Sequence, residues 1–536
     1  MLRQIPGLGQ VSGIYAAGFD DVEQYNGLPY GEVSARFAPA SLVKTWPNGQ
    51  WDGTIYGPIC PFPKMVIGMG LTQQKLPPQH DYVMDEFKCL NLNITCPKGS
   101  TPGDDLPVIV WVHGGGNCVG SGSDSGYNGA PLVSFAQEQS LPTVVVTINY
   151  RLGAFGFLAS SDIRSDNQAS GSSGVGNYGL RDILLAFEWV KTNIKAFGGN
   201  PHNVTAAGQS AGSIDLHLLM CSELFPSAKP FNQVILASGV ASLTVRSLKH
   251  QQVIYDKIAA RLGVQEHHTA RERLKALRGV PADELVNSYV ALGAPVVSWQ
   301  ATVDGVFLKQ TPSVSNLPFQ KYDPGLRRVL IGDCAHEGTI FAFPLKAMQF
   351  DYPKLQQMAS SLLGDEASKE LLQEYGISAS SSPEDLFTRL TLLDTDAEWS
   401  HPIQTVARSF SEQDVFYYHI RDVNPFPGPN KGLSHHGVDL LYIFLTYQSY
   451  LPDNPAKLAK AFAKSWLVFA NGGTPWKSYD KTQDGKSIIM YFGPNGVNTE
   501  GSEESKMAYK GLQVCEKLLL KHPYFVASLR GENIVE

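Results

Sequence analysis

Residues 204–212 are Val-Thr-Ala-Ala-Gly-Gln-Ser-Ala-Gly, an apolar run that ends in a G-x-S-x-G motif around Ser210. Residues 213–220, which follow, favour a helix. Glycines two positions before and two positions after the serine permit a sharp turn, because a bulkier side chain would clash inside it. A tight strand-to-helix turn of this kind exposes the serine Oγ at its apex. We therefore predict a nucleophile elbow at Ser210.

The rest of the chain shows strands that alternate with helices. Strand-like runs lie at 107–113, 141–150, 203–209, 232–237, 327–332 and 414–420, and a clear helical pattern covers 180–194. This alternation predicts an α/β fold with a mostly parallel sheet flanked by helices. No repeat or linker divides residues 1–536, so we expect one domain. Helix-rich stretches at about 245–325 and 345–410 are expected to be insertions over the active site, and helical patterns near 455–471 and 505–521 close the chain.

A second glycine-rich segment, His113-Gly-Gly-Gly-Asn117, follows the predicted strand at 107–113. Acyl transfer builds negative charge on a carbonyl oxygen, which backbone N–H groups stabilise when they can approach it closely. An HGGG segment upstream of a G-x-S-x-G motif recurs as a unit in lipases and esterases. We therefore predict an oxyanion hole formed by the N–H groups of Gly115, Gly116 and Ala211.

A serine hydroxyl becomes a good nucleophile only when a base takes its proton. The chain has 13 histidines. The segment Gly432-Leu-Ser-His-His-Gly437 is a loop before an apolar run, and we assign His436 in it as the base, with His435 as the alternative. Activity is expected to fall on the acid side, as His436 takes up a proton.

The imidazole in turn needs an acid that fixes its tautomer and stabilises its cation. Residues 328–341 are a predicted strand that ends in a loop with two carboxylates, and we choose Glu337, with Asp333 as the alternative. The order Ser210, Glu337, His436 matches nucleophile, acid and histidine in α/β-hydrolases.

Composition and motifs exclude several other functions. The net charge is −7 with no basic cluster, so there is no electrostatic footprint for nucleic acid or an anionic membrane. Apolar runs such as 107–112 are far shorter than the roughly 18 residues of a membrane span. Residues 174–179 fit G-x-G-x-x-G, but a polar stretch rather than a strand precedes them, which argues against a dinucleotide site. No metal motif is present, and we expect neither cofactor nor metal.

The N-terminal residues Met-Leu-Arg-Gln-Ile-Pro-Gly lack the apolar core of a signal peptide. This indicates a cytoplasmic protein if Met1 is the native start, or a secreted one if a signal has been removed. The seven cysteines are an odd number and do not indicate a disulfide framework by themselves.

Separated segments along nearly the whole chain together resemble the type-B carboxylesterase family, which includes cholinesterases and fungal lipases. Beyond the motifs above, they are Gly9-Gln-Val-Ser-Gly13, Asn26-Gly-Leu-Pro-Tyr30, Arg36-Phe37, Cys89-Leu-Asn-Leu-Asn-Ile94, Asn149-Tyr-Arg-Leu-Gly-Ala-Phe-Gly-Phe157, Asn177-Tyr-Gly-Leu-Arg-Asp182, Trp189-Val-Lys-Thr-Asn-Ile-Lys-Ala-Phe-Gly-Gly-Asn-Pro201 and Val303-Asp-Gly305.

The resemblance implies an α/β-hydrolase fold and a serine esterase that acts through an acyl-enzyme on a small-molecule ester. It implies the same nucleophile, acid, base and oxyanion donors as the motifs do. The family's supporting serine, near the acid and the histidine, falls on Ser238. Its first disulfide would join Cys60 to Cys89, and closing a loop of about 30 residues would contribute roughly 3–4 kcal/mol.

The chain departs from the family pattern at three places. Gln209 stands before the nucleophile, where the family often has Glu. The acid before Cys89 is Glu86, displaced by one residue, which puts the family's ion pair with Arg36 in question. Residues 61–88 contain no Trp, so the cation–π partner of choline-selective members is missing, and we predict against a quaternary-ammonium substrate.

Two alternative functions use the same scaffold. Lactone opening or acyl transfer would use the same triad with an alcohol in place of water. A non-catalytic adhesion or binding module is disfavoured, because such relatives typically lose a member of the triad and all three are present here.

Overall fold

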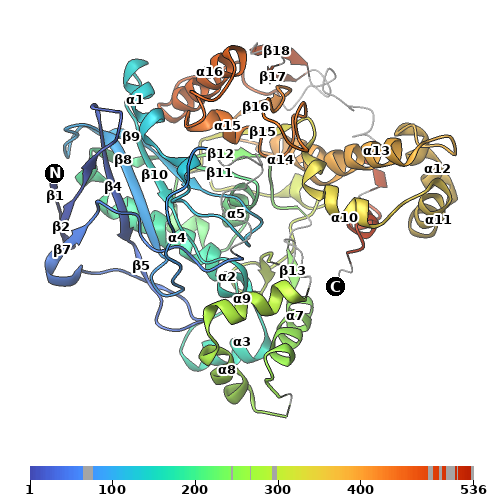
Figure 1. Ribbon diagram of the computed structural model, residues 1–536, viewed down its shortest axis with the longest axis horizontal. Coiled ribbons are helices and arrows are strands. Elements are labelled where there is room, and N and C mark those ends of the chain that lie inside the picture. The colour runs from blue at the N-terminus through green and yellow to red at the C-terminus, as the bar shows by residue number, and fades with distance from the viewer. Residues whose placement is uncertain are drawn as a thin grey trace.

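The computed structural model describes residues 1–536 apart from 64–75, 243–244, 266, 293–298, 481–486, 494–497, 503–513, 516, 519 and 533–536. Its central element is an eleven-stranded sheet of order β18-β17-β16-β15-β12-β11-β9-β10-β8-β4-β3 (Figure 1). The strands are β3 (Ile14–Tyr15), β4 (Val22–Pro29), β8 (Asn91–Pro97), β9 (Leu106–Val112), β10 (Val144–Ile148), β11 (Gly199–Gln209), β12 (Gln233–Ala237), β15 (Arg328–Cys334), β16 (Asp414–Ile420), β17 (Ile488–Phe492) and β18 (Asn498–Ser502).

The sheet is parallel from β10 through to β17 and antiparallel at both edges. The predicted mostly parallel sheet is therefore confirmed, and β16 has the predicted bounds. Smaller sheets join β1 (Leu2–Ile5), β2 (Gly9–Ser12) and β7 (Gln50–Asp52), then β5 (Gly31–Glu32) and β6 (Ser41–Leu42), then β13 (Arg246–Ser247) and β14 (Thr302–Val303).

Helices lie on both faces of the sheet and beyond its ends (Figure 1). They are α1 (Ala130–Glu138), α2 (Gly153–Phe157), α3 (Ser161–Ala169), α4 (Tyr178–Asn193), α5 (Ala211–Met220), α6 (Phe225–Ala228), α7 (Leu248–Arg261), α8 (Ala270–Gly279), α9 (Ala282–Ala291), α10 (Ala342–Ala347), α11 (Tyr352–Leu363), α12 (Asp365–Glu374), α13 (Pro383–Thr395), α14 (His401–Ser409), α15 (Leu440–Ile443), α16 (Asp453–Ala470) and α18 (Phe525–Leu529). The helices predicted within 245–325 and 345–410 are present as α7–α9 and α10–α14, which form separate groups in Figure 1. Most of the helical pattern predicted near 505–521 lies outside the described residues.

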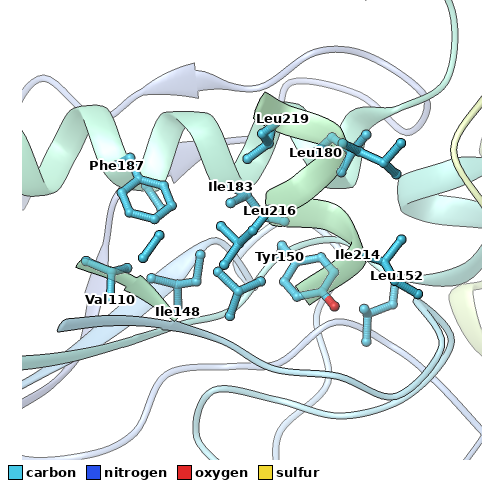
Figure 2. Close-up of a cluster of buried hydrophobic side chains, with 14 of the residues drawn as sticks. Val110, Ile148, Tyr150, Leu152, Leu180, Ile183, Phe187, Ile214, Leu216 and Leu219 are labelled. Atoms are coloured by element: carbon cyan, nitrogen blue, oxygen red, sulfur yellow. The ribbon is translucent and has the colours of Figure 1, made fainter. Parts of the chain in front are cut away.

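The core is built on the alternation of side chains along the central strands. Val110 on β9 belongs to one buried cluster with Leu180, Ile183 and Phe187 of α4, whose spacing places them on one helical face. Figure 2 shows this cluster, which Ile214, Leu216 and Leu219 of α5 complete. The neighbouring Ile109 and Trp111 face the opposite side and join the residues of α1 and α16. The sheet is therefore buried on both faces.

Strands β4 and β8 were not among the predicted strand-like runs. Both carry polar side chains that are nevertheless buried, such as Gln24 and Asn93. Asn93 donates hydrogen bonds to Thr147 on β10 and to Ser123, and Gln24 donates to Thr95 across the pair. These partners satisfy the buried amide groups. The amide side chains themselves interrupt the apolar pattern by which a strand is predicted from sequence.

The ion pair of Arg36 is present, which corrects the expectation drawn from the displaced acid. Arg36 Nη2 lies 2.5 Å from Glu86 Oε1, and Arg36 Nε donates to Glu86 Oε2 at 2.7 Å. Glu86 reaches inward from a turn, whereas Phe87 beside it is exposed. Because Glu86 lies in a turn, its carboxylate reaches the Arg36 guanidinium although it is one residue away from the family's position.

The disulfide implied by the family resemblance is not present in the structure. Cys60 and Cys89 are buried free thiols that contact each other. A hydrogen bond from Cys60, followed by burial, raises the pKa of the Cys89 thiol well above its usual value. Two neighbouring thiols are the reduced form of a disulfide. The oxidation of Cys60 and Cys89 to a disulfide stays a prediction.

Candidate active site

Ser210 lies at the predicted sharp turn. Strand β11 ends at Gln209, helix α5 begins at Ala211, and Ser210 between them has φ 56° and ψ −126°. A non-glycine residue adopts such values only where its surroundings enforce them. A Cβ on Gly208 would lie 2.6 Å from the carbonyl of Gly212, and one on Gly212 would collide with Val112 O. The two glycines of the motif are thus required by close packing.

The side chains of Ser210, His436 and Glu337 form one hydrogen-bonded chain. Ser210 Oγ lies 2.8 Å from His436 Nε2, and His436 Nδ1 lies 2.5 Å from Glu337 Oε2. The second oxygen of Glu337 accepts a hydrogen bond from Cys334 N at 2.7 Å. All three side chains are buried. The structure therefore brings together the three residues predicted as nucleophile, base and acid.

The carboxyl ends of the parallel strands explain how distant residues meet, because these ends lie along one edge of the sheet. Glu337 opens the short 3₁₀ helix η7 (Glu337–Phe341) just after β15. His436 lies in the long connection after β16. The two loops are joined directly, since His336 N donates to Ser434 O at 2.8 Å. This contact fixes the acid loop against the histidine loop.

The alternative residues take other partners. His435 has Nδ1 2.7 Å from His436 O and Nε2 3.0 Å from Asn424 Nδ2. Burial lowers the pKa of His435 to about 4, so it is neutral at physiological pH. Asp333 pairs with His419 Nδ1 at 2.8 Å and accepts a hydrogen bond from Ser400. The geometry favours His436 and Glu337 over both.

The predicted oxyanion loop packs directly on the serine. A Cβ on Gly114 would lie 2.7 Å from Gln209 O and 3.0 Å from Ser210 Cβ. Gly115 has φ 105° and Gly116 has φ 62°, values that favour glycine. Neither N–H group donates a hydrogen bond to a residue that the structure describes. Ala211 is the first residue of α5, where N–H groups lack partners within the helix.

Ser238, the predicted supporting serine, and Gln209, which precedes the nucleophile, both lie beside the site. Ser238 is fully buried with φ 51°, and its Oγ lies 3.6 Å from Cys334 Sγ. Because Cys334 N binds Glu337, Ser238 is connected to the acid through this cysteine. The Nε2 of Gln209 is buried and has no hydrogen-bond partner within the described part of the chain.

One residue at the site has no sequence signal of its own. The ring of Trp399 lies 4.4 Å from that of His436, at an interplanar angle of 47°. It belongs to a π-helical segment, η8 (Asp396–Ser400), between α13 and α14. π-Helical segments are rare in proteins, and those that do occur often lie at functional sites. Only the tertiary structure reveals that this helix reaches the histidine.

The described residues contain no group of three His, Cys, Asp or Glu side chains arranged to hold a metal ion. No helix within them has the length and apolar character needed to cross a membrane.

The chain is similar in sequence and in structure to carboxylesterases and lipases. The model of the Carboxylesterase family matches residues 2–506. Lipase 1 of Yarrowia lipolytica is 29% identical, with 85% of each chain aligned. The para-nitrobenzyl esterase of Bacillus subtilis is 28% identical over 94% of this chain and 96% of its own. The structure of Geobacillus stearothermophilus carboxylesterase EST55 superposes with a TM-score of 0.75 at 25% identity, covering 96% of this chain and 100% of that one.

These likenesses confirm the α/β-hydrolase fold and the resemblance drawn from the sequence motifs. Ester hydrolysis is the activity of this family. The chain belongs to the carboxylesterase family and is a carboxylic ester hydrolase.

Proposed function

We propose that the protein cleaves a small-molecule carboxylic ester through an acyl-enzyme on Ser210, with His436 as the general base and Glu337 as the acid that orients it. The observation that supports this most is the unbroken chain from Ser210 Oγ through both nitrogens of His436 to Glu337 Oε2. Each contact has the length at which proton transfer and charge stabilisation occur.

In the first half of the reaction, Ser210 Oγ attacks the ester carbonyl while its proton passes to His436 Nε2. Glu337 keeps the Nδ1–H tautomer in place and stabilises the imidazolium that forms. The N–H groups of Gly115, Gly116 and Ala211 bind the oxyanion. The carbon–oxygen bond to the alcohol then breaks, and Nε2 returns its proton to the departing oxygen.

In the second half, water attacks the acyl carbon and gives a proton to His436 Nε2. The bond to Ser210 Oγ breaks, the serine regains its proton from His436, and a carboxylic acid leaves. No cofactor takes part in this scheme. The neutral Gln209 beside the nucleophile offers no negative charge to a cationic alcohol, which supports an uncharged ester as substrate.

The test is hydrolysis of p-nitrophenyl esters of increasing acyl length by the wild-type protein and S210A. A p-nitrobenzyl ester is added because one relative is a para-nitrobenzyl esterase. Turnover by the wild type and none by S210A is expected. The matched control is S222A, since Ser222 is a buried serine just beyond α5 whose hydroxyl donates to Leu219 O and to no other residue that the structure describes.

Product analysis with added alcohol separates hydrolysis from acyl transfer. Free acid as the main product supports hydrolysis, whereas a new ester as the main product supports transfer with the same residues. An inert wild type, or activity retained by S210A, contradicts the proposal.

A further inference from the structure

A buried carboxyl group lies within the helix that follows the nucleophile. Asp215 is on α5, one turn after Ala211, and its side chain is fully buried. Its Oδ1 accepts a hydrogen bond from Asn117 Nδ2 at 3.1 Å. Its Oδ2 has no hydrogen-bond partner among the residues that the structure describes. Buried polar groups are usually fully hydrogen-bonded, but this carboxyl binds one amide and no cation among the described residues. Its role is therefore sought in what the Asn117 amide does.

Asn117 closes the loop that carries the predicted oxyanion donors. It directly follows Gly116 and has φ 58°. Its side-chain Oδ1 lies 3.3 Å from the hydroxyl of Tyr150, and its main-chain carbonyl accepts a hydrogen bond from Gly153 N at 2.6 Å. The amide nitrogen of Asn117 is therefore bound by Asp215, and its amide oxygen lies near the Tyr150 hydroxyl.

The other end of the same loop is held by the same tyrosine. The Tyr150 hydroxyl donates to His113 O at 2.8 Å, and its ring is stacked on that of His113 with centroids 4.6 Å apart. The single hydroxyl proton of Tyr150 is directed to His113 O, the nearer acceptor, and Asn117 Oδ1 at 3.3 Å is a weaker shared contact, whereas Asp215 connects residues 113–117 to α5. Figure 2 shows Tyr150 beside α5, close to Ile214 and Leu216.

The link between loop and helix matters because the predicted donors are divided between them. Gly115 and Gly116 are on the loop, and Ala211 is at the start of α5. An oxyanion hole works only when its donors converge within hydrogen-bond distance of one point, and small displacements are costly.

We propose, on the basis of the function above, that Asp215 is a positioning residue which, through Asn117, sets the distance between the loop donors and the helix donor of the oxyanion hole. Asp215 acts here as a neutral hydrogen-bonding group. Burial raises its pKa to about 8, and the hydrogen bond from Asn117 opposes this only in part. An uncharged amide of the same shape should therefore replace it.

The experiment compares D215A, D215N and N117G, with p-nitrophenyl butyrate as substrate and a trifluoromethyl ketone as inhibitor. Such a ketone adds to the nucleophilic serine and places an oxyanion in the hole, so its affinity reports the donors directly. Glycine is chosen at 117 because it tolerates the positive φ. Thermal melting of each variant separates misfolding from mispositioning.

We expect D215A and N117G to lower kcat by about 10-fold or more, which is less than the roughly 10²–10³-fold loss on removing an oxyanion donor, because the donors here are displaced rather than lost. Inhibitor affinity should fall by a similar factor, whereas KM should stay within about 3-fold. D215N should restore kcat and inhibitor affinity to within about 3-fold of wild type. The double variant D215A/N117G should resemble either single variant, because both break the same link.

Full inhibitor affinity in folded D215A or N117G overturns the proposal, as does a D215N variant impaired as strongly as D215A. If D215A does not fold, N117G and D215N decide the matter in the same way. Failure of the proposed function would look different, because the wild type would then be inactive or S210A would remain active.

Discussion

The indole of Trp399 lies against the His436 imidazole, with ring centroids 4.4 Å apart and the ring planes inclined at 47°. The tryptophan comes from the π-helical segment between α13 and α14, so a helix-rich part of the chain outside the sheet forms one wall of the candidate site. An aromatic face attracts a cation. The contact can therefore favour the imidazolium that the proposed mechanism forms.

Replacing Trp399 by Leu should lower kcat on p-nitrophenyl esters by about 5-fold, which corresponds to roughly 1 kcal/mol of lost cation–π stabilisation. W399F is the control, because it keeps an aromatic face against His436. An unchanged kcat in W399L, with the same melting temperature as wild type, would remove Trp399 from the account.

The two adjacent histidines should behave very differently. H436A should lower kcat by at least about 10⁴-fold, since the serine loses its base. H435Q should keep kcat within about 10-fold, because His435 contacts Asn424 and a backbone carbonyl rather than Ser210. Steady-state hydrolysis with circular dichroism of each variant measures this. Equal losses in both variants would show that the assignment of the base is wrong.

Asp439 should make stability depend on pH. It is fully buried, and within the described part of the chain only the N–H groups of Leu440 and of Asp439 itself lie near its carboxyl oxygens as donors. Burial, and then the neighbouring Glu337 carboxylate, raise its pKa to about 8. In the unfolded chain the group ionises near pH 4. Between these values the folded protein holds a proton that the unfolded chain has lost, so this group's contribution to stability falls as pH rises to about 8 and is constant above it.

The measurement is the melting temperature of wild type and D439N from pH 5 to 9. The melting temperature of D439N minus that of wild type should increase up to about pH 8 and then stay constant. E138Q changes an exposed carboxyl and should show no such trend. A difference between D439N and wild type that stays constant over the whole range would show that Asp439 is ionised in the folded protein at neutral pH.

The buried pair of Arg36 and Glu86 should be structural. E86A should lower the free energy of unfolding by about 3 kcal/mol, because it leaves a buried guanidinium without its carboxylate. The matched control is E223Q, which breaks the exposed pair of Glu223 with Lys309 and should cost less than about 1 kcal/mol. Urea unfolding gives both values. A loss in E86A no larger than in E223Q would contradict a structural role for the pair.

Much of the fold was predictable because its signals are local. The strand at 414–420 contains four consecutive β-favouring residues, from Val415 to Tyr418, and the glycines around Ser210 mark a turn that only they permit. Strand β8 was missed because Asn93 interrupts the apolar pattern, and the partners that satisfy its amide, such as Thr147, are far away in sequence.

The candidate residues of the triad could be named from motifs and their order, although Ser210 and His436 are 226 positions apart. Trp399 and Asp215 could not, since neither stands in a motif of its own. Asp215 contacts Asn117 because of the position of α5, and Trp399 contacts His436 because of the position of the π-helical segment. The ion pair of Arg36 was also not predictable from the family pattern. Glu86 is shifted by one residue from the family's acid, yet a turn brings it to the Arg36 guanidinium.

The most direct test of the account is to treat the protein with a p-nitrophenyl alkylphosphonate, which reacts with an activated serine and leaves a stable adduct. Intact-mass and peptide analysis should find one phosphonyl group per chain, on the peptide that contains Ser210, with activity lost in proportion to labelling. S210A should stay unlabelled. Loss of activity with the label on another residue, or with no label at all, would contradict Ser210 as the nucleophile.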